Sequence, residues 1–482
     1  MFFVTCLKII SILLAIVGVT FGIPLSVAFV YGEQCAVWPF VIPMAISIVL
    51  MLLINIPTRK IKIHMSIRQT YVIVALAWIC LSLMGSIPLY FSGSYPNFTD
   101  AFFESVSGFS TTGCTVCASV SDLPRSINLW RCLTHWLGGM GVVTLTVALL
   151  PLLGVGGFQL IKAETTGPEK GKVTDRITTT AKVLWIIYAA FTALETVLLM
   201  CAGMDFVDAL SHAFATLGTG GFSTRNGSIG EYNSAAIDII ITVFMFLAGI
   251  NFSLFYYLII RKFNDIVTNT ELKVYLGLVI VEMLAVALCI LPVYHNFGTS
   301  LRYSAFQVVS LLTTTGFGTA DYLQWPATAQ SLLFLLFFIG GCSGSTGGGV
   351  KVVRWVILAK QVNNETKKML HPHGVFSIRI NNRVSEKSLV LNVTSFMILY
   401  FILVAITTFV GCLGKLDLFT AFTGALSMVG NVGPGYGALG PAFNYGFLPA
   451  FVKWWYSFAM LAGRLELYTM IIFFLPSYWK KH

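Results

Sequence analysis

Long apolar runs alternate with short polar stretches along the whole chain. Ten of these runs are about 20 residues long or longer, the length of helix that crosses roughly 30 Å of hydrocarbon at ~1.5 Å per residue. The pattern predicts ten spanning helices, and an even number of crossings puts both chain ends on one side of the membrane. The predicted spans are residues 9–30, 37–56, 71–91, 128–153, 183–202, 236–260, 274–293, 327–360, 389–412 and 450–475.

Residues 340–349 interrupt the eighth run with the sequence GGCSGSTGGG. Each glycine costs about 1 kcal/mol relative to alanine in a helix, so we expect the helix to open there, in the middle of the membrane. The whole run, 327–360, is also too long for one straight crossing. The alternative is a passive break that lets helices pack closely, but that role requires small residues at helical spacing rather than an unbroken run.

Four semi-hydrophobic stretches, each too short to cross, separate the third and fourth, fifth and sixth, seventh and eighth, and ninth and tenth spans. Each ends in threonines or glycines and predicts a short helix followed by a glycine turn. Their similarity indicates internal repeats. Aligned on one glycine, they read DAFFESVSGFSTTG to Gly113, DALSHAFATLGTGG to Gly221, YSAFQVVSLLTTTG to Gly316 and TAFTGALSMVGNVG to Gly433.

Four re-entrant loops predict one shared aqueous cavity. Non-helical backbone is tolerated at membrane depth only where protein buries it or where it lines such a cavity. A short helix that enters from outside points the negative end of its dipole inward, which favours a cation. Glycine and threonine then allow successive carbonyls to replace the hydration shell of the ion. Ordinary extracellular loops are the alternative, and four copies in register disfavour it.

The predicted fold is therefore an all-α membrane protein. Two extra N-terminal helices precede four copies of a helix, pore-loop, helix unit around one pore. The predicted divisions are 1–69 for the N-terminal helices and a basic loop, 70–155 for repeat 1, 156–260 for repeat 2, 261–388 for repeat 3 with the glycine-rich interruption, and 389–482 for repeat 4.

Composition and charge agree with a bilayer as the solvent. The 482 residues are 56% hydrophobic and 10% charged, too few polar groups to cover a water-soluble globule. The net charge of +10 reflects the orientation of the chain in the membrane, because most Lys and Arg residues lie in every second connecting segment. By the positive-inside rule these segments and both termini are cytoplasmic. This distribution argues against nucleic acid as a partner.

Other chemistry finds little support in the sequence. The pair Cys114 and Cys117 forms a CxxC, but without a second ligand pair it is weak evidence for a metal or redox site. A membrane enzyme would need a clustered nucleophile and base, or a metal set such as HExxH. The seven histidines form no such set, and the acids within the predicted spans are few and have no evident partner. A structural or receptor-like membrane protein is a further alternative.

Several fragments together resemble one known family. They are FFESVSGFSTTG, FATLGTGGFST, IGGCSGSTGGGVKV and AGRLELYT, and the similarity extends along essentially the whole chain. The chain resembles the Trk/Ktr/HKT superfamily of potassium transporters, and within it the bacterial TrkH/TrkG type, which also has two extra N-terminal spans. The resemblance implies potassium uptake across the bacterial inner membrane through a selective, gated pore, without enzymatic activity. Channel-like flow and proton-coupled symport both remain open.

The resemblance also implies two sets of site residues. The selectivity filter would comprise Thr111, Thr112, Gly113, Thr219, Gly220, Gly221, Thr314, Thr315, Gly316, Asn431, Val432 and Gly433. In the fourth repeat Asn431 replaces a hydroxyl and Pro434 follows the glycine, so we expect the ion sites to depart from fourfold symmetry. The gate would comprise Gly340, Gly341, Cys342, Ser343, Gly344, Ser345, Thr346, Gly347, Gly348 and Gly349, with Lys351 and Arg464.

Arg464 lies eleven residues after Lys453 in the last predicted span, near the bilayer centre. A charge there costs roughly 2.5–3.5 kcal/mol, so it should face the protein interior and have a partner. We expect it to face the glycine-rich interruption. The alternative is an ion pair with Glu466 that only holds helices together. Lys351 and Arg354 could instead snorkel to the interface. Glu104 and His212 lie on the short helices and are expected to bond neighbours rather than ions.

No cytoplasmic segment exceeds about 40 residues, which is below the usual size of a domain. Any nucleotide regulation would therefore need a separate subunit. The resemblance implies a peripheral TrkA-like partner that binds NAD and ATP, and a homodimer in which each protomer has its own pore. It implies no covalently bound cofactor, with K⁺ as the transported ion.

Overall fold

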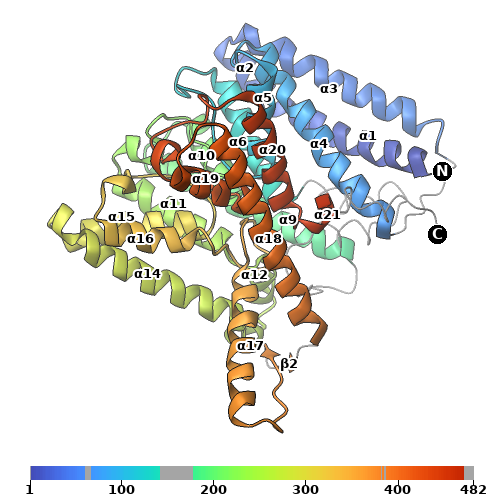
Figure 1. Cartoon of the computed structure of the whole chain (residues 1–482). Coiled ribbons are helices and arrows are strands. Elements are labelled where there is room, and N and C mark those ends of the chain that lie inside the picture. Colours follow the sequence, from blue (N-terminus) through green and yellow to red (C-terminus); the bar gives the residue numbers. More distant parts are fainter. Residues whose placement is uncertain (1, 60–66, 142–176, 382, 385–386, 472–482) are drawn as a thin grey trace.

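The computed structural model describes residues 2–59, 67–141, 177–381, 383–384 and 387–471. Almost all of this is helical (Figure 1). The strands in the described part are β1 (Arg379–Ile380) and β2 (Arg383–Val384), which form a short antiparallel hairpin beside the long helix α17. All-helical structure suits a chain in hydrocarbon, because a helix satisfies its own backbone hydrogen bonds.

The N-terminal helices form a group at one side of the molecule, drawn in blue in Figure 1. The first predicted span is two consecutive helices, α1 (Phe2–Thr20) and α2 (Gly22–Tyr31). The second and third are α3 (Gln34–Asn55) and α4 (Ile67–Phe91). Helix α1 packs against both α3 and α4.

Four short helices match the four predicted stretches, and all four begin in the same way. An Asn or Asp side chain caps each one by accepting a hydrogen bond from a backbone N–H in the first turn, which satisfies a donor that the helix itself cannot. The caps are Asn97, Asp205, Asn296 and Asp417. The helices are α5 (Phe98–Phe109), α10 (Phe206–Leu217), α15 (Phe297–Leu312) and α19 (Leu418–Gly430).

Each short helix packs against the helix before it and the helix after it. Thus α5 lies between α4 and α6, α10 between α9 and α11, α15 between α14 and α16, and α19 between α18 and α20. The flanking helices are α6 (Arg125–Gly139), α9 (Ile177–Cys201), α11 (Ala235–Ala248), α14 (Thr270–Tyr294), α16 (Ala327–Leu336), α18 (Lys387–Leu413) and α20 (Ala450–Arg464).

The remaining elements are short or lie at the ends of these units. They are α12 (Phe252–Ile259), α13 (Phe263–Val267), α17 (Val352–Leu370), α21 (Tyr468–Ile471) and the 3₁₀ turns η2 (Ser228–Tyr232), η3 (Tyr322–Gln324) and η4 (Gly437–Leu439). Helix α17 extends away from the body of the molecule (Figure 1).

Within the described residues, six helices are long and apolar enough to cross a membrane, or seven with the bent pair α11 and α12. They match the first, second, third, fifth, seventh and ninth predicted spans, and the bent pair matches the sixth. The fourth and tenth predicted spans extend into residues 142–153 and 472–475, which lie outside the described part. The total of ten crossings therefore stays a prediction.

Within the described residues, four of the predicted runs are not continuous helices: the first is divided between α1 and α2, the sixth between α11 and α12, the eighth between α16 and α17, and the tenth between α20 and α21. The eighth is broken, as expected: α16 ends at Leu336 and α17 begins at Val352. The sixth was expected to be one helix, and this was wrong, because α11 and α12 meet at an angle of 92°. At this bend Asn251 caps α12 by accepting a hydrogen bond from the N–H of Ser253, so a new helix begins there.

Candidate functional site

The four short helices also end with the same backbone geometry. The residue two positions before each aligned glycine has a left-handed φ between 52° and 59°. The next N–H donates to the carbonyl five residues back at 2.8–2.9 Å, which is the Schellman ending of a helix. Left-handed φ is rare for a β-branched residue, and threonine holds this position in three of the four copies. The left-handed residues are Thr111, Thr219, Thr314 and Asn431.

The four aligned glycines lie in a closed ring. A side-chain carbon placed on Gly113 would lie 1.7 Å from the carbonyl oxygen of Gly220, in the second copy. The same relation runs from each copy to the next and returns from the fourth to the first. The other approaches are Gly221 to the Thr315 oxygen at 2.1 Å, Gly316 to the Val432 oxygen at 2.3 Å, and Gly433 to the Thr112 oxygen at 2.6 Å.

This ring brings together the filter residues predicted from the sequence. Side chains at the four glycines would collide with neighbouring carbonyls, and all four have positive φ, from 78° to 100°. Glycine is the residue that meets both demands. On one side of the ring is an open cavity of about 180 Å³, whose lining includes all four glycines. Closely spaced neutral oxygens suit a dehydrated cation.

The fourth copy differs from the others in side chain and, to a smaller degree, in backbone, because the N–H of Asn431 donates to the carbonyl four residues back and Gly433 has a φ of 100°. Asn431 has the same left-handed φ, 54°, as the threonines. Its Nδ2 donates to Thr112 Oγ1 at 3.0 Å and to the Met460 carbonyl at 2.9 Å, so it links the fourth copy to the first. The fourth copy thus departs from the other three, and the expected departure of the ion sites from fourfold symmetry stays a prediction.

Residues 340–349, the glycine loop, lie directly against the ends of α15 and α19. The N–H of Gly348 donates to Thr314 Oγ1 at 2.6 Å. A side-chain carbon on Gly348 would lie 2.6 Å from the Gly430 carbonyl oxygen. The loop closes on itself through a hydrogen bond of 2.8 Å from the N–H of Gly340 to the Val350 carbonyl. The glycine run therefore forms a compact loop that packs beside the predicted filter residues.

Arg464, at the end of α20, reaches the glycine loop as predicted. Its Nη1 donates to the Thr346 carbonyl at 2.8 Å, and its Nη2 donates at 2.6 and 2.8 Å to the carbonyls of Gly138 and Gly139 at the end of α6. The side chain thus joins the loop to the first copy. Glu466, proposed as an alternative partner, forms an ion pair of 2.5 Å with Arg354.

Lys351 and Arg354 do not snorkel outward, so that interpretation was wrong. Both are buried, at 1% and 4% exposed. Lys351 donates through Nζ to the carbonyl of Gly347 inside the loop. The guanidinium of Arg354 lies 3.6 Å from the ring centre of Phe396. Lys351, Arg354 and Arg464 therefore lie around one small pocket together with the last three glycines of the loop.

Glu271 is a loop contact that the sequence analysis missed. It lies in the first turn of α14, is buried, and accepts hydrogen bonds from the N–H of Ser343 at 2.7 Å and of Val353 at 3.0 Å. One carboxylate oxygen therefore joins the loop, at Ser343, to the start of α17, at Val353. Nothing local in the sequence signals this role, because the bonded residues are 72 and 82 positions away.

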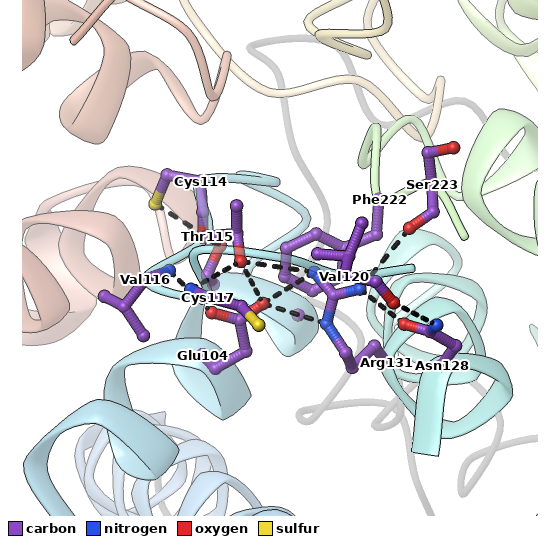
Figure 2. Close-up of polar contacts among 12 residues, drawn as sticks. Glu104, Cys114, Thr115, Val116, Cys117, Val120, Asn128, Arg131, Phe222 and Ser223 are labelled. Carbon is purple, nitrogen blue, oxygen red and sulfur yellow. Dashed lines mark hydrogen bonds and ion pairs between the residues drawn. The ribbon is translucent and has the colours of Figure 1, made fainter. Parts of the chain in front are cut away.

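The acids within the predicted spans were expected to have no partner, and this was wrong for Asp238 and Glu466, which form ion pairs with Arg302 and Arg354. Glu104 on α5 and Arg131 on α6 form a fully buried ion pair of 2.7 Å, shown in Figure 2. Other described acids also pair, because a buried carboxylate needs compensation. These pairs are Asp100 with Lys453, Asp208 with Arg225, and Asp238 with Arg302. As predicted, Glu104 and His212 bond neighbouring protein groups.

The thiols of Cys114 and Cys117 have different surroundings. Cys114 is buried, with Sγ 3.6 Å from the sulfur of Met460, whereas Cys117 Sγ donates to the Ser119 carbonyl. Among the described residues no group of three or more His, Cys, Asp or Glu could hold a metal ion.

The comparisons with known proteins place this architecture in a family. Residues 39–481 match the family model TrkH, described as a cation transport protein. The chain belongs to the TrkH family of cation transport proteins. It is 38% identical to the Trk system potassium uptake protein TrkH of Escherichia coli K12, over 98% of this chain and 99% of that protein. It is 36% identical to TrkG of the same organism, over 88% of each chain.

A solved structure agrees over the full length. The crystal structure of the potassium transporter TrkH from Vibrio parahaemolyticus covers 100% of both chains, with 34% identity and a TM-score of 0.88. The chain is accordingly a predominantly helical membrane protein of a transport family rather than an enzyme.

Proposed function

We propose that this chain takes up potassium ions across the bacterial inner membrane through a single pore. The observation that carries the proposal is the closed ring of four glycines, each against a carbonyl of the next copy. Such a ring offers oxygens and no intruding side chains, which suits a dehydrated cation. The relatives named above are potassium uptake proteins, which favours K⁺ as that cation. The filter comprises the twelve residues predicted from the sequence.

The glycine loop acts as the gate of this pore. It packs against the ends of α15 and α19, where it obstructs the pathway beside the filter. The Ser343 N–H of the loop donates a hydrogen bond to Glu271, its Thr346 carbonyl accepts one from Arg464, and backbone hydrogen bonds join the loop to the bend between α11 and α12. Opening then requires breaking a defined set of hydrogen bonds rather than unfolding a helix.

A cytoplasmic partner controls the gate, and the membrane protein works as a homodimer with one pore in each protomer. Helix α17 follows the glycine loop directly and extends from the body of the molecule (Figure 1). A nucleotide-binding subunit of the TrkA type that contacts α17 would pull on the loop through one continuous helix. Both termini lie in the cytoplasm, on the same side as the basic segments.

The test is ion flux into liposomes that contain the purified chain. We expect uptake of K⁺ or Rb⁺ to exceed that of Na⁺ and to be driven by membrane potential. Repeating the measurement with an imposed pH gradient separates channel-like flow from proton symport. Liposomes without selective K⁺ uptake, with or without a nucleotide-binding partner, would overturn the proposal.

A further inference from the structure

In each copy, one residue of the short helix contacts the segment that follows the aligned glycine. This residue, here called the brace, lies nine positions before that glycine in all four copies. In α5, Glu104 Oε2 accepts a hydrogen bond from the N–H of Val116 at 2.9 Å. In α10, His212 Nε2 lies 2.9 Å from Ser223 Oγ. These contacts fix the chain two or three residues beyond the glycine.

In the third and fourth copies, a different group makes the equivalent contact. In α15, Gln307 Nε2 donates to the Ala320 carbonyl at 3.0 Å. In α19 the equivalent position is Gly424, which has no side chain. A side-chain carbon on Gly435 would lie 3.4 Å from the backbone nitrogen of Gly424, so the loop segment at Gly435 packs directly on the backbone of α19. The braces are therefore an acid, an imidazole, an amide and a bare backbone contact.

The first brace is the charged one, and it reaches into the second copy (Figure 2). Arg131 donates to Glu104 Oε1 through Nε at 2.9 Å and Nη2 at 2.7 Å, and both side chains are at most 1% exposed. Its Nη1 donates to Asn128 Oδ1 at 2.9 Å and to the Ser223 carbonyl at 3.4 Å. The guanidinium lies 4.2 Å from the ring centre of Phe222, the residue after Gly221.

Glu104 completes the same network on the side of the first copy. Its Oε1 accepts from Thr115 Oγ1 at 2.8 Å, and Thr115 Oγ1 in turn accepts from the N–H of Cys117 at 3.1 Å. A single buried pair therefore holds the segments that follow both Gly113 and Gly221.

A cation in the wall of a cation pathway needs a physical reason, since Arg131 lines the cavity that contains the four glycines. Its charge alone would repel the ion, and buried ion pairs are weak contributors to stability. The planar guanidinium, however, fixes several acceptors in one geometry. We therefore interpret Arg131 as a group that positions the segments it bonds, while the carboxylate of Glu104 neutralises the positive charge of its guanidinium.

We propose that Glu104 and Arg131 are positioning residues for ion selectivity, which set the spacing between the first and second filter loops. This rests on the proposed function, because it assigns them a part in choosing K⁺ over Na⁺. Selectivity of a carbonyl ring depends on its size and on the number of its dipoles. A looser ring would admit Na⁺ more readily.

The test compares K⁺ to Na⁺ permeability ratios in liposomes for Glu104→Gln and Arg131→Lys. Glu104→Gln removes the negative charge that neutralises Arg131, and Arg131→Lys replaces the planar guanidinium by an ammonium group. For each variant we expect the K⁺ to Na⁺ permeability ratio to fall by about threefold or more. Matched controls are Asp205→Asn and Arg125→Lys, which alter an ion pair that is 45–49% exposed. These controls should keep the wild-type ratio.

A third variant covers the case in which the single variants fail to fold. The double variant Glu104→Met with Arg131→Met removes both charges and keeps the volume, an exchange that folded proteins often tolerate. It should conduct with reduced selectivity. A wild-type ratio in the double variant, or in both single variants, would overturn the inference, whereas a wild-type chain without K⁺ selectivity would overturn the proposed function instead.

Discussion

The backbone of Gly113 meets two demands that no other residue type meets together. Its φ is 80°, and a side-chain carbon would lie 1.7 Å from the Gly220 carbonyl oxygen. Any larger residue must therefore displace a carbonyl of the neighbouring copy. The aligned repeats were enough to single out this glycine in the sequence, and the family resemblance implied its place in the filter. Its close approach to the Gly220 carbonyl could not be predicted, because Gly220 belongs to another copy.

We predict that Gly113→Ser lowers the K⁺ to Na⁺ permeability ratio by about tenfold, equivalent to ~1.4 kcal/mol of discrimination. The displaced Gly220 carbonyl and the added hydroxyl together favour a smaller, more hydrated ion. Reversal potentials measure the ratio directly. The control is Ala118→Ser, at an exposed site beyond the ring, and a Gly113→Ser ratio equal to wild type would remove Gly113 from the filter.

Arg464 is the second residue whose role depends on a few atoms. Replacing it by Ala leaves the Thr346, Gly138 and Gly139 carbonyls without their shared donor. Hydrogen bonds to a charged group contribute about 1.5–3 kcal/mol each, so we expect basal Rb⁺ flux to rise by roughly tenfold while the protein still inserts. Normal flux together with better insertion would instead make Arg464 a dispensable structural charge.

At the scale of elements, the glycine loop is a break in a helix that its surroundings hold in one conformation. It is bonded to α14, α20, the third filter loop and the bend between α11 and α12. The break itself could be predicted from the glycine content. The contact with Arg464 was also predicted, from the depth of that charge in the last span. The contacts with Glu271 and with the bend could not be predicted, because the bonded residues are far apart along the chain and the bend at Asn251 carries no strong local signal.

Shortening the loop, for example by deleting residues 343–347, should raise resting flux and weaken its dependence on a cytoplasmic partner. The physical reason is that the obstruction beside Thr314 and Gly430 would be gone. Size-exclusion chromatography in detergent checks that the deletion variant folds. Unchanged resting flux in a folded deletion variant would show that the loop does not gate.

Glu271 offers a milder change to the same element. Glu271→Ala leaves the N–H groups of Ser343 and Val353 without this acceptor, and each lost buried bond costs about 1–3 kcal/mol. We expect a looser loop and a several-fold higher basal flux. Lys273→Ala, an exposed change near the same end of α14, is the control. Equal flux in both variants would mean that Glu271 does not restrain the loop.

At the scale of the whole molecule, four unequal copies combine into one ring. Repetition in the sequence was visible because the short helices and their glycines recur in register. The order of contact around the ring, from the first copy to the fourth and back, needed three-dimensional structure. So did the ion pair of Glu104 with Arg131, whose members are 27 residues apart on different helices.

The central claim is that these four loops form one filter, and one set of measurements tests it most directly. Serine is introduced separately at Gly113, Gly221, Gly316 and Gly433, and the K⁺ to Na⁺ permeability ratio of each variant is measured in liposomes. We predict that all four ratios fall below wild type, because each substitution displaces a carbonyl of the next copy. Wild-type ratios in any folded, conducting variant of this set would contradict a single four-part filter.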